Sequence, residues 1–449
     1  MAGLTVENLR YHIIVLLFAV IYLQQVLTVN IGGSLKIYEV LLAILLSLYL
    51  VDRTISDRIS LSLFFFFVLC PLAGMILYYM DGSFNTYYER FPEARVWQRF
   101  NPGFAPLMIF LYDLMNWIGF NSISSHKKVF QNRKKIVKLF LYSGCFVIIY
   151  ALYAHYFIFK MNFPDIIPDI LDSRNSLPEK EPRISGFSAE PGTFIFLLSW
   201  MLLYLVYLND IFTRQWIRYS MIFLVLWAIF LTMSSAIVGI FLSFLIYCLL
   251  CWKPAKIIRL GAVILAITTI GYLSQDKVNI SHLKYSFVDK IERFISGSNH
   301  TSGSGAMRSY TAKLGYELFK DFPIFGVGSG NSYFFLWRYE HDTSTIPTIE
   351  KINHSTPPQN SHSKILSERG LVGYLFLLIF FVSMILKSRR QYLNGAISKN
   401  IFALTFISTT MLFIMMFSIY PIYSFFLWLN TALMNNMLKF SERKNPIHE

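Results

Sequence analysis

The chain has 449 residues, of which 55% are hydrophobic and 17% aromatic. The apolar residues occur in long runs and do not alternate with polar ones, which is typical of a membrane protein and not of a soluble domain. The formal net charge of +14 would suggest nucleic-acid binding in a soluble protein. Here the basic residues lie in particular connections between apolar segments, so they indicate orientation in a membrane instead.

A helix needs roughly 20 apolar residues to cross the hydrocarbon of a bilayer, where only a helix satisfies its own backbone. Twelve segments meet this requirement, near residues 12–30, 36–51, 60–80, 104–122, 137–158, 191–208, 216–232, 235–252, 257–274, 365–386, 400–418 and 422–438. The first lacks a basic leader and a small-residue cleavage site, so it is predicted to be a retained helix. The expected fold class is therefore an all-α membrane protein with about twelve transmembrane helices.

Connections rich in Lys and Arg predict which loops are cytoplasmic. Residues 123–136 carry five Lys and Arg and no acidic residue, and residues 387–399 carry four, whereas the turns near 31–35, 232–235 and 419–422 carry none. Twelve spans with both termini in the cytoplasm fit this distribution. Three longer connections, 81–103, 159–190 and 275–364, then lie on the far side of the membrane.

The chain divides into three regions without a repeat of fixed period. Residues 1–274 hold nine spans with the outer loops 81–103 and 159–190, residues 275–364 form one large outer loop, and residues 365–449 hold three spans and a cytoplasmic tail. Within the large loop, apolar residues at helical spacing predict helices over 282–296 and about 306–320. All four cysteines lie in predicted spans, so no disulfide framework is expected.

Three alternate glycines, Gly326, Gly328 and Gly330, follow Pro323. No strand precedes them and the spacing of a dinucleotide-binding motif is missing, so a nucleotide site is not predicted. Glycines at this spacing let backbone N–H groups approach a ligand closely, which suits a phosphate site, or they permit a tight turn. The sequence leaves both interpretations open.

The outer loop before the sixth span contains Arg183 and ends in Glu190 and Pro191. Pro191 lies where a helix tolerates proline, so Glu190 is predicted at a helix N-terminus on the membrane surface. Its carboxylate then complements the helix dipole, worth up to ~1 kcal/mol. Alternatively, Arg183 turns back toward it, so that the guanidinium binds a phosphate and the carboxylate activates a hydroxyl.

The end of the large loop is polar and leads directly into a span. Asn360, Lys364 and Glu368 recur every four residues, so a Lys364–Glu368 ion pair worth a few tenths of a kcal/mol is one interpretation. His362 lies about 120° from Glu368 on the helical wheel, which excludes a direct dyad between the two. Each of them could still face a cavity with partners from other loops, although a lone surface histidine is more often solvated.

Glu39 and Asp113 fall within predicted spans, where an ionised group costs about 3 kcal/mol and needs a partner, a proton or a water-filled cavity. A transporter would use such residues. The sequence contains no Ser/His/Asp constellation, zinc-protease motif, P-loop or Asp-x-Asp pair. We therefore expect no metal and no cofactor, and any bound phosphate would be held by arginines.

Together these motifs resemble the bacterial O-antigen polymerase and ligase family, which are lipid-carrier-dependent membrane glycosyltransferases. The matching pieces are Arg183-x-x-Gly186 through Glu190-Pro191, Leu231-Thr232-Met233-Ser234, Arg308 before the Pro-x-x-Gly-x-Gly run, and Asn360 through Glu368-x-Gly370-x-x-Gly373. Two departures stand out. Many relatives have Ser-Arg where this chain has Ser234-Ser235, and a histidine directly before the asparagine where this chain has Gln359.

The resemblance implies a GT-C-like fold, with termini in the cytoplasm and an active site on the periplasmic face of the inner membrane. It implies that glycan on undecaprenyl diphosphate is the donor and a second lipid-linked unit the acceptor, joined by inverting transfer without metal or nucleotide sugar. The implied diphosphate and substrate ligands are Arg183, Arg308, Asn360, Gly326 and Gly328. The implied catalytic candidates are Glu190 as the preferred base, His362 as the second, and Glu368.

Membrane lipid and a chain-length regulator are further candidate partners, and nucleic acid is not. An O-antigen ligase would pass glycan from the same donor to a lipid A core sugar, and the Glu190-Pro191 pair favours the polymerase. A transporter or flippase of lipid-linked sugars would need charges in many spans and inverted repeats. A glycan-binding scaffold would have no use for paired Arg and Glu. The enzyme's site is expected where the 159–190 loop and the large loop meet over the bundle.

Overall fold

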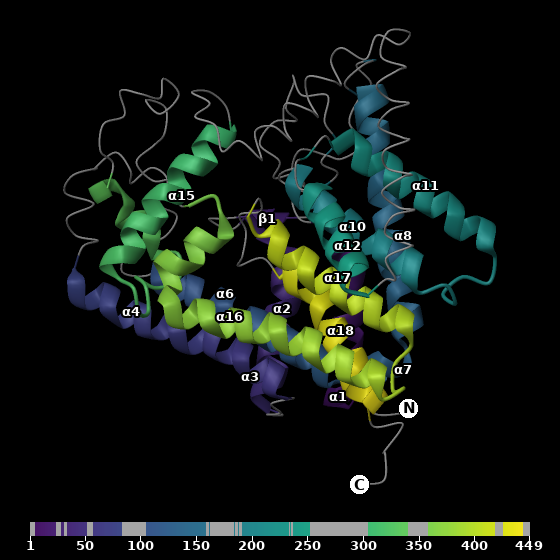
Figure 1. The fold of residues 1–449 in the computed structure, drawn as a ribbon, viewed down its shortest axis with the longest axis horizontal. Coiled ribbons are helices and arrows are strands. Elements are labelled where there is room, and N and C mark those ends of the chain that lie inside the picture. The colour runs from purple at the N-terminus through teal and green to yellow at the C-terminus, as the bar shows by residue number, and fades with distance from the viewer. Residues whose placement is uncertain are drawn as a thin grey trace.

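The computed structural model describes residues 5–23, 28–30, 34–51, 57–82, 105–158, 161, 184, 187, 191–232, 234, 237–251, 304–339, 358–417 and 425–442. These residues form a helical bundle with one short antiparallel strand pair (Figure 1). The predicted helix over 282–296 and the predicted span over 257–274 lie outside the described residues, as do Arg183 and Glu190.

The first helix, α1 (Val6–Val20), begins after Thr5, whose side chain accepts a hydrogen bond from the Asn8 N–H. The expected first span over 12–30 is therefore wrong in its bounds, because this cap places the polar first turn inside the helix. Strand β1 (Thr28–Asn30) then pairs antiparallel with β2 (Ser34–Lys36), and α2 (Ile37–Val51) follows. Apart from this pair of three-residue strands the described residues form helices and turns, which fits the expected all-α class.

The middle of the chain follows the predicted spans closely. The run from Arg58 to Asp81 consists of α3 (Arg58–Phe64), the π-helical turn η1 (Phe65–Leu69) and α4 (Cys70–Asp81). The next elements are α6 (Ala105–Ser125), α7 (Lys127–Gln131), α8 (Arg133–Tyr153) continued by the π-helical turn η3 (Ala154–Ile158), α10 (Pro191–Tyr207), α11 (Gln215–Thr232) and α12 (Ile237–Cys251). Proline at the first position of α10 confirms the predicted helix start.

The last described elements are α15 (Ser304–Asp321), the 3₁₀ turns η5 (Asn331–Phe334) and η6 (Leu336–Tyr339), α16 (Ser361–Leu393), α17 (Lys399–Met415) and α18 (Phe426–Glu442). Helix α15 confirms the predicted helix near 306–320. Helix α16 begins at Ser361, one turn before the apolar span predicted from residue 365, because Asn360 caps it.

Four described helical runs are long and apolar enough to cross a membrane, namely Arg58–Asp81, Arg133–Ile158, Gln215–Thr232 and Ser361–Leu393. Four shorter apolar helices accompany them, at Ile37–Tyr49, Gly192–Tyr207, Ile237–Cys251 and Lys399–Met415. The chain is thus an integral membrane protein of mainly helical structure. The count of twelve spans stays a prediction. All four cysteines are free thiols within described helices.

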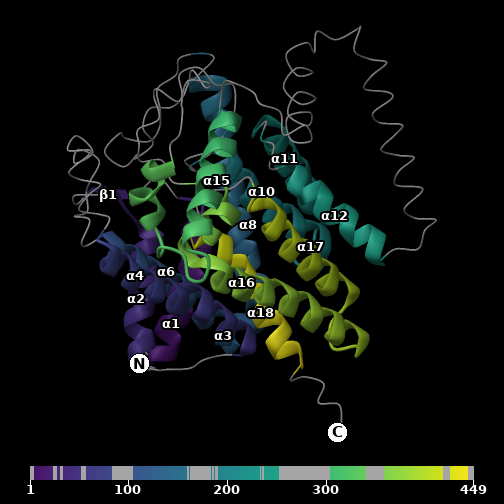
Figure 2. The same ribbon diagram turned by 60° about the vertical axis from the view of Figure 1, so that its left-hand side comes forward.

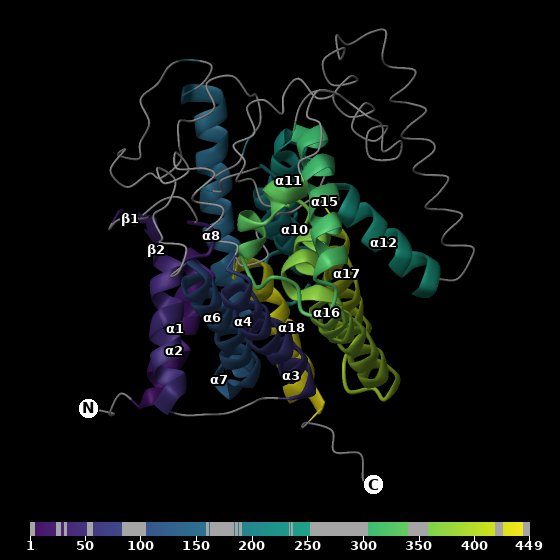
Figure 3. The same ribbon diagram turned by 90° about the vertical axis from the view of Figure 1, so that its left-hand side faces the viewer.

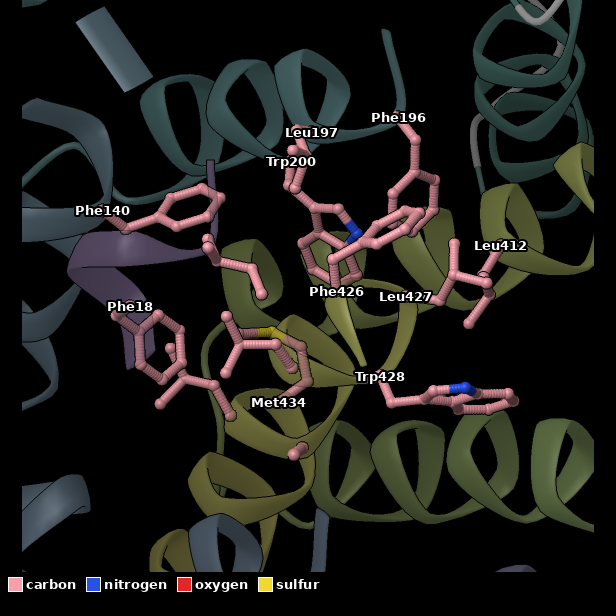
Figure 4. Close-up of a cluster of buried hydrophobic side chains, with 14 of the residues drawn as sticks. Phe18, Phe140, Phe196, Leu197, Trp200, Leu412, Phe426, Leu427, Trp428 and Met434 are labelled. Carbon is pink, nitrogen blue, oxygen red and sulfur yellow. The ribbon is translucent and has the colours of Figure 1, made fainter. Parts of the chain in front are cut away.

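Helix α18 lies in the core of the bundle and packs on α6, α16 and α17. Figure 4 shows how Trp428 and Met434 of this helix lie among aromatic and aliphatic side chains from α1, α8, α10 and α17. Both Trp200 and Trp428 are completely buried, and each contributes a large apolar surface to the core. This core fixes the positions of the helices on which the outer elements stand.

Helix α17 connects two groups of helices, because it packs on α16 on one side and on α10 and α12 on the other. In Figure 2, α15 and α12 lie on opposite sides of α17, and Figure 3 shows α1 and α2 on the side of the bundle away from α12. At one end of the bundle, the Lys128 ammonium donates to the Asn8 amide oxygen, which joins α7 to α1. At the opposite end, α15 packs on α16.

Candidate functional site

Helix α15, the turn over residues 322–330 and the first part of α16 (residues 361–369) form one packed unit, called the rim unit below. Gly315 lies so close to α16 that an added Cβ would come within 2.4 Å of the Ser363 Oγ. The Ser363 hydroxyl donates to the Ala312 carbonyl at 3.0 Å, and the Gln359 N–H donates to the Thr311 hydroxyl at 3.2 Å. The two helices are thereby joined by a close approach at Gly315 and by two hydrogen bonds, each between a short side-chain hydroxyl and a backbone group.

Asn360 is the N-cap of α16. Its side-chain oxygen accepts hydrogen bonds from the N–H groups of His362 and Ser363, at 2.9 and 3.2 Å. These are two of the N–H groups that a helix start leaves without an intrahelical acceptor. The cap accounts for the asparagine structurally. Its predicted part in substrate binding stays a prediction.

His362 is buried where the start of α16 meets the end of α17. Its Nε2 lies 3.1 Å from the Phe413 carbonyl oxygen and its Nδ1 lies 3.1 Å from the Tyr374 hydroxyl. A carbonyl only accepts, so Nε2 carries the proton and Nδ1 accepts from Tyr374. The neighbouring Ser361 N–H donates to the Met416 carbonyl at 3.0 Å. The hydrogen bonds from the His362 Nε2–H and from the Ser361 N–H satisfy two carbonyls at the C-terminus of α17. Capping α17 is thus a structural role for this histidine.

Helix α16 is broken at Gly370, which has φ of 62° and ψ of −168°. The break leaves carbonyls before it and N–H groups after it without intrahelical partners. The turn over residues 322–330 supplies both: Val327 and Gly328 donate to the carbonyls of Ser367 and Glu368, at 3.0 and 2.8 Å. In return, the N–H groups of Leu371 and Val372 donate to the carbonyls of Pro323 and Ile324, at 2.8 and 3.1 Å.

These four hydrogen bonds explain the glycine run. Gly326 and Gly328 both have positive φ, at 65° and 89°. A Cβ on Gly326 would lie 2.4 Å from the Glu368 carbonyl carbon, and one on Gly328 would lie 2.8 Å from the Met75 nitrogen. Their N–H groups donate to protein carbonyls, with Gly326 bonded to Phe322. The backbone supports the tight-turn interpretation, and ligand binding by these glycines stays a prediction.

An ion pair is completely buried beside the break. The Arg369 Nη2 lies 2.6 Å from the Asp113 Oδ1, with the two side chains 1% and 0% exposed. The Arg369 Nε donates to the Ser329 hydroxyl at 3.2 Å, and its guanidinium stacks 4.0 Å from the centre of the Phe66 ring. Asp113 therefore has the partner that its place in a span requires. Glu39 likewise lies 3.8 Å from the Lys36 ammonium.

Glu368 is buried next to this pair, and its Oε1 accepts a hydrogen bond from the Ser332 hydroxyl at 2.6 Å. His362 has different partners, which agrees with the predicted absence of a direct His362–Glu368 dyad. The carboxylate thus joins α16 to η5 within the rim unit. In this arrangement Glu368 stabilises the unit, and its catalytic role stays a prediction.

Arg308 lies near the start of α15, one turn before Thr311 and Ala312. Those two residues contact Gln359 and Ser363, so α15 carries Arg308 to the same end of the rim unit as Asn360 and His362. The structure thus brings together three of the predicted site residues on one body. Arg308 as a whole residue is half-buried. Arginine at such an edge presents a planar fork of N–H donors suited to a phosphate.

Arg183 and Glu190 lie outside the described residues, but the structure describes Ile184 and Gly192 close to them in the chain. The Ile184 N–H donates to the Leu231 carbonyl at 3.2 Å, at the end of α11. A Cβ on Gly192 would lie 3.7 Å from the Ser234 Oγ, and Gly239 of α12 packs on Met415 of α17. These contacts bring the starts of α10 and α12 to the end of α17 that His362 caps.

The sequence analysis missed the role of Arg369, although it noted that Asp113 needs a partner. It also missed Tyr374 and Ser332, whose hydroxyls carry no pattern that would mark them. Among the described residues, no group of three or more His, Cys, Asp and Glu side chains could hold a metal ion. An arginine fork beside a helix start and a buried capping histidine is an arrangement that can bind an anionic group.

Residues 220–378 match the family model described as O-antigen ligase. The matched segment extends from α11 into α16 and contains Arg308, Asn360, His362 and Glu368, while Arg183 and Glu190 precede it. The match confirms the resemblance to the O-antigen polymerase and ligase family, whose members are membrane glycosyltransferase-like enzymes. No curated protein matches the chain.

Proposed function

We propose that this chain, a member of the O-antigen polymerase and ligase family, is a polymerase that joins repeat units carried on undecaprenyl diphosphate. The reaction takes place at the outer face of the bacterial inner membrane. The observation that carries the proposal is the rim unit, which holds Arg308 at the same end as Asn360 and His362 within the matched segment. This unit is a preorganised edge over a bundle of apolar helices.

In the proposed reaction, Arg308 and Arg183 bind the diphosphate of the donor glycan. The acceptor hydroxyl loses its proton to a base, its oxygen attacks the anomeric carbon, and the bond from that carbon to the diphosphate oxygen breaks. Negative charge develops on the departing lipid diphosphate. The positive charge of the two guanidinium groups stabilises that developing charge, and electrostatic stabilisation of this kind is often the largest catalytic contribution.

Glu190 is the preferred base. His362 fits this role poorly because its Nδ1 lone pair accepts from Tyr374 and its Nε2 proton is donated to Phe413. Glu190 directly precedes α10, whose start lies beside Ser234. A carboxylate at a dry membrane edge can have its pKa raised toward neutrality, which suits a general base.

An O-antigen ligase is the second candidate, and it is favoured by the match of residues 220–378 to the O-antigen ligase family model. A ligase uses the same lipid-linked donor but transfers the glycan to a sugar of the lipid A core. Binding of the diphosphate by Arg308 serves both reactions equally. A transporter gains little support, because the buried Asp113 that suggested it is paired with Arg369.

Deletion of the gene followed by gel analysis of the surface glycan distinguishes the candidates. A ladder that collapses to a single repeat unit on the lipid A core indicates a polymerase. Complete loss of capped core, with accumulation of lipid-linked polymer, indicates a ligase. An unchanged ladder contradicts both, and restoration by the wild-type gene is the control.

A further inference from the structure

Two irregular helices meet at Arg369. Its guanidinium lies over Phe66 at 4.0 Å and over Phe67 at 5.2 Å, and both rings come from the π-helical turn η1. Arg369 itself is the last residue before the break of α16 at Gly370. Single π-helical turns within α-helices occur frequently at functional sites. Here the turn presents two aromatic faces to one guanidinium.

The ion pair between Arg369 and Asp113 joins the rim unit to the bundle. Arg369 ends the first part of α16, which belongs to the rim unit, whereas Asp113 belongs to α6, which packs on the central helix α18. The Ser329 hydroxyl, from the turn over residues 322–330, accepts from the Arg369 Nε. One guanidinium therefore bonds the turn, α16 and α6 at the same point.

Several other attachments of the rim unit are close contacts of its backbone. Gly328 packs on Gly74 of α4, where a Cβ on Gly74 would come within 2.3 Å of the Gly328 nitrogen. Gly330 packs on Ile109 of α6, and Ser361 donates to Met416 at the end of α17. Such contacts define how near the unit lies, but a planar guanidinium bonded through Nη2 to Asp113 and through Nε to Ser329 also fixes its direction.

From these contacts we propose that Arg369 and Asp113 are positioning residues of the glycosyl transfer. Their pair holds the rim unit at a fixed angle across the break at Gly370, and so places Arg308 over the bundle where the lipid diphosphate binds. The inference rests on the proposed function for Arg308 only. Neither residue touches substrate, since both side chains are completely buried.

The first test is transfer activity of the purified protein in proteoliposomes with a lipid-linked glycan. We expect kcat/KM to fall about 100-fold in Asp113→Asn and in Arg369→Gln, because a displacement of about 1 Å costs that much. Arg369→Lys keeps the charge but loses the fork and the stacking, so an intermediate loss is expected. The matched control is Arg338→Gln, which breaks the half-exposed pair with Asp81 at 3.5 Å and leaves activity within about twofold.

The second test measures position without activity. Spin labels at Lys320 on α15 and Leu393 at the far end of α16, both exposed, report the angle across the break. They are placed in a chain whose four native cysteines are replaced. We expect a narrow distance distribution in the otherwise unchanged protein and a shifted or broadened one in Asp113→Asn and Arg369→Lys. An unchanged distribution would overturn the proposal.

A disulfide between Ser361→Cys and Met416→Cys, at the backbone contact of α16 with α17, ties the rim unit down independently. Positioning predicts that oxidation restores the activity of Arg369→Gln at least tenfold. A purely structural role predicts lower thermal stability with unchanged distance and unchanged activity per folded molecule, and direct catalysis predicts no rescue. Either result overturns the inference. If the unaltered protein transfers no lipid-linked glycan, the proposed function fails, while the distance measurement still decides on positioning.

Discussion

Two clusters of buried polar side chains occupy opposite ends of the bundle, and they differ in what they bond. The inner cluster consists of Asp57, Lys387, Gln391, Asn435 and Asn436. The outer cluster consists of Asp113, Ser329, Ser332, Glu368 and Arg369. Both are mostly buried, so burial alone does not distinguish the two clusters. The hydrogen-bond partners of their side chains distinguish them.

The inner cluster mainly serves helix ends. The Asn436 Nδ2 lies 2.8, 3.3 and 3.1 Å from the carbonyl oxygens of Ile123, Ser124 and His126, at the C-terminus of α6. The Gln391 amide donates to the Leu438 carbonyl at 3.0 Å, near the end of α18. Asp57 caps α3, and its second oxygen accepts from the Lys387 ammonium at 3.3 Å and from the Asn435 amide at 3.2 Å. Most of these bonds go to the backbone groups that a helix terminus leaves without an intrahelical partner, and the Asp57 bonds hold one such cap in place, so helix termination accounts for the cluster.

The outer cluster has no such task, because the turn over residues 322–330 already satisfies the backbone at the break of α16. Its ionised side chains bond one another and hydroxyl groups. Buried charges are costly to desolvate, so their presence without a backbone to satisfy needs another reason. We attribute it to the position of Arg308. The comparison indicates that buried polar side chains which do not bond backbone groups mark a functional region better than the burial of polar side chains alone does.

Arg308→Ala tests this difference between the two clusters most directly, and it has the largest expected effect on glycan transfer. Removing the guanidinium that binds the diphosphate should lower glycan transfer by about 100-fold or more, without loss of protein from the membrane. The measurement is the surface-glycan ladder together with an immunoblot. Lys313→Ala is the matched control, an exposed cation on the same helix, and it should leave the ladder unchanged. Full activity of Arg308→Ala would remove this residue from the site.

Glu190→Gln and His362→Gln sharpen the choice of base. Glutamine in place of Glu190 keeps the size but loses the proton acceptor, so a loss of roughly 100-fold is expected. Glutamine in place of His362 retains an N–H donor for the Phe413 carbonyl, so transfer should stay within about tenfold of the unaltered protein. Initial rates with lipid-linked substrate decide. The reverse order of effects would make His362 the base.

Gly326→Ala tests whether the glycine run forms a turn, and its effect is on stability first. Its positive φ and the contact of a new Cβ with the α16 backbone should together lower the free energy of unfolding by about 3 kcal/mol or more. Gly395→Ala has a similar φ of 71° with nothing within 4 Å, so about 1 kcal/mol is expected. Thermal unfolding in detergent compares the two. Equal losses would argue against the interlock of the turn with α16.

Much of the bundle was predictable because apolar periodicity and loop charge act locally. The starts of α10 and α15 follow from Pro191 and from the Ser/Gly-rich stretch before residue 306. The break at Gly370 was not predictable, since one glycine in an apolar helix is usually tolerated. Its evidence lies in a second segment, Pro323 to Gly328, whose N–H and C=O groups complete the hydrogen bonds of α16.

The candidate site was predictable as motifs and not as contacts. Arg308, Asn360 and His362 were chosen from motifs, and their functional roles stay predictions. The Asn360 cap lies within three residues of the chain, whereas the His362 Nε2 bonds the Phe413 carbonyl of α17, which is 51 residues away. No sequence pattern marks Arg369, which lies between Glu368 and Gly370, as the partner of Asp113. The signal for it was the unexplained Asp113, because a carboxylate in a span requires a cation somewhere.

Asn436→Ala has the smallest expected effect on transfer and tests the inner cluster. The alanine leaves the carbonyls at the end of α6 without their donor, which should lower the free energy of unfolding by about 1 to 3 kcal/mol. Activity per folded molecule should not change, because this end of the bundle lies opposite the rim unit. Thermal unfolding and initial rates on the same preparation measure the two quantities separately. A tenfold loss of kcat at full folding would mean that both polar clusters serve catalysis, and the distinction between them would fall.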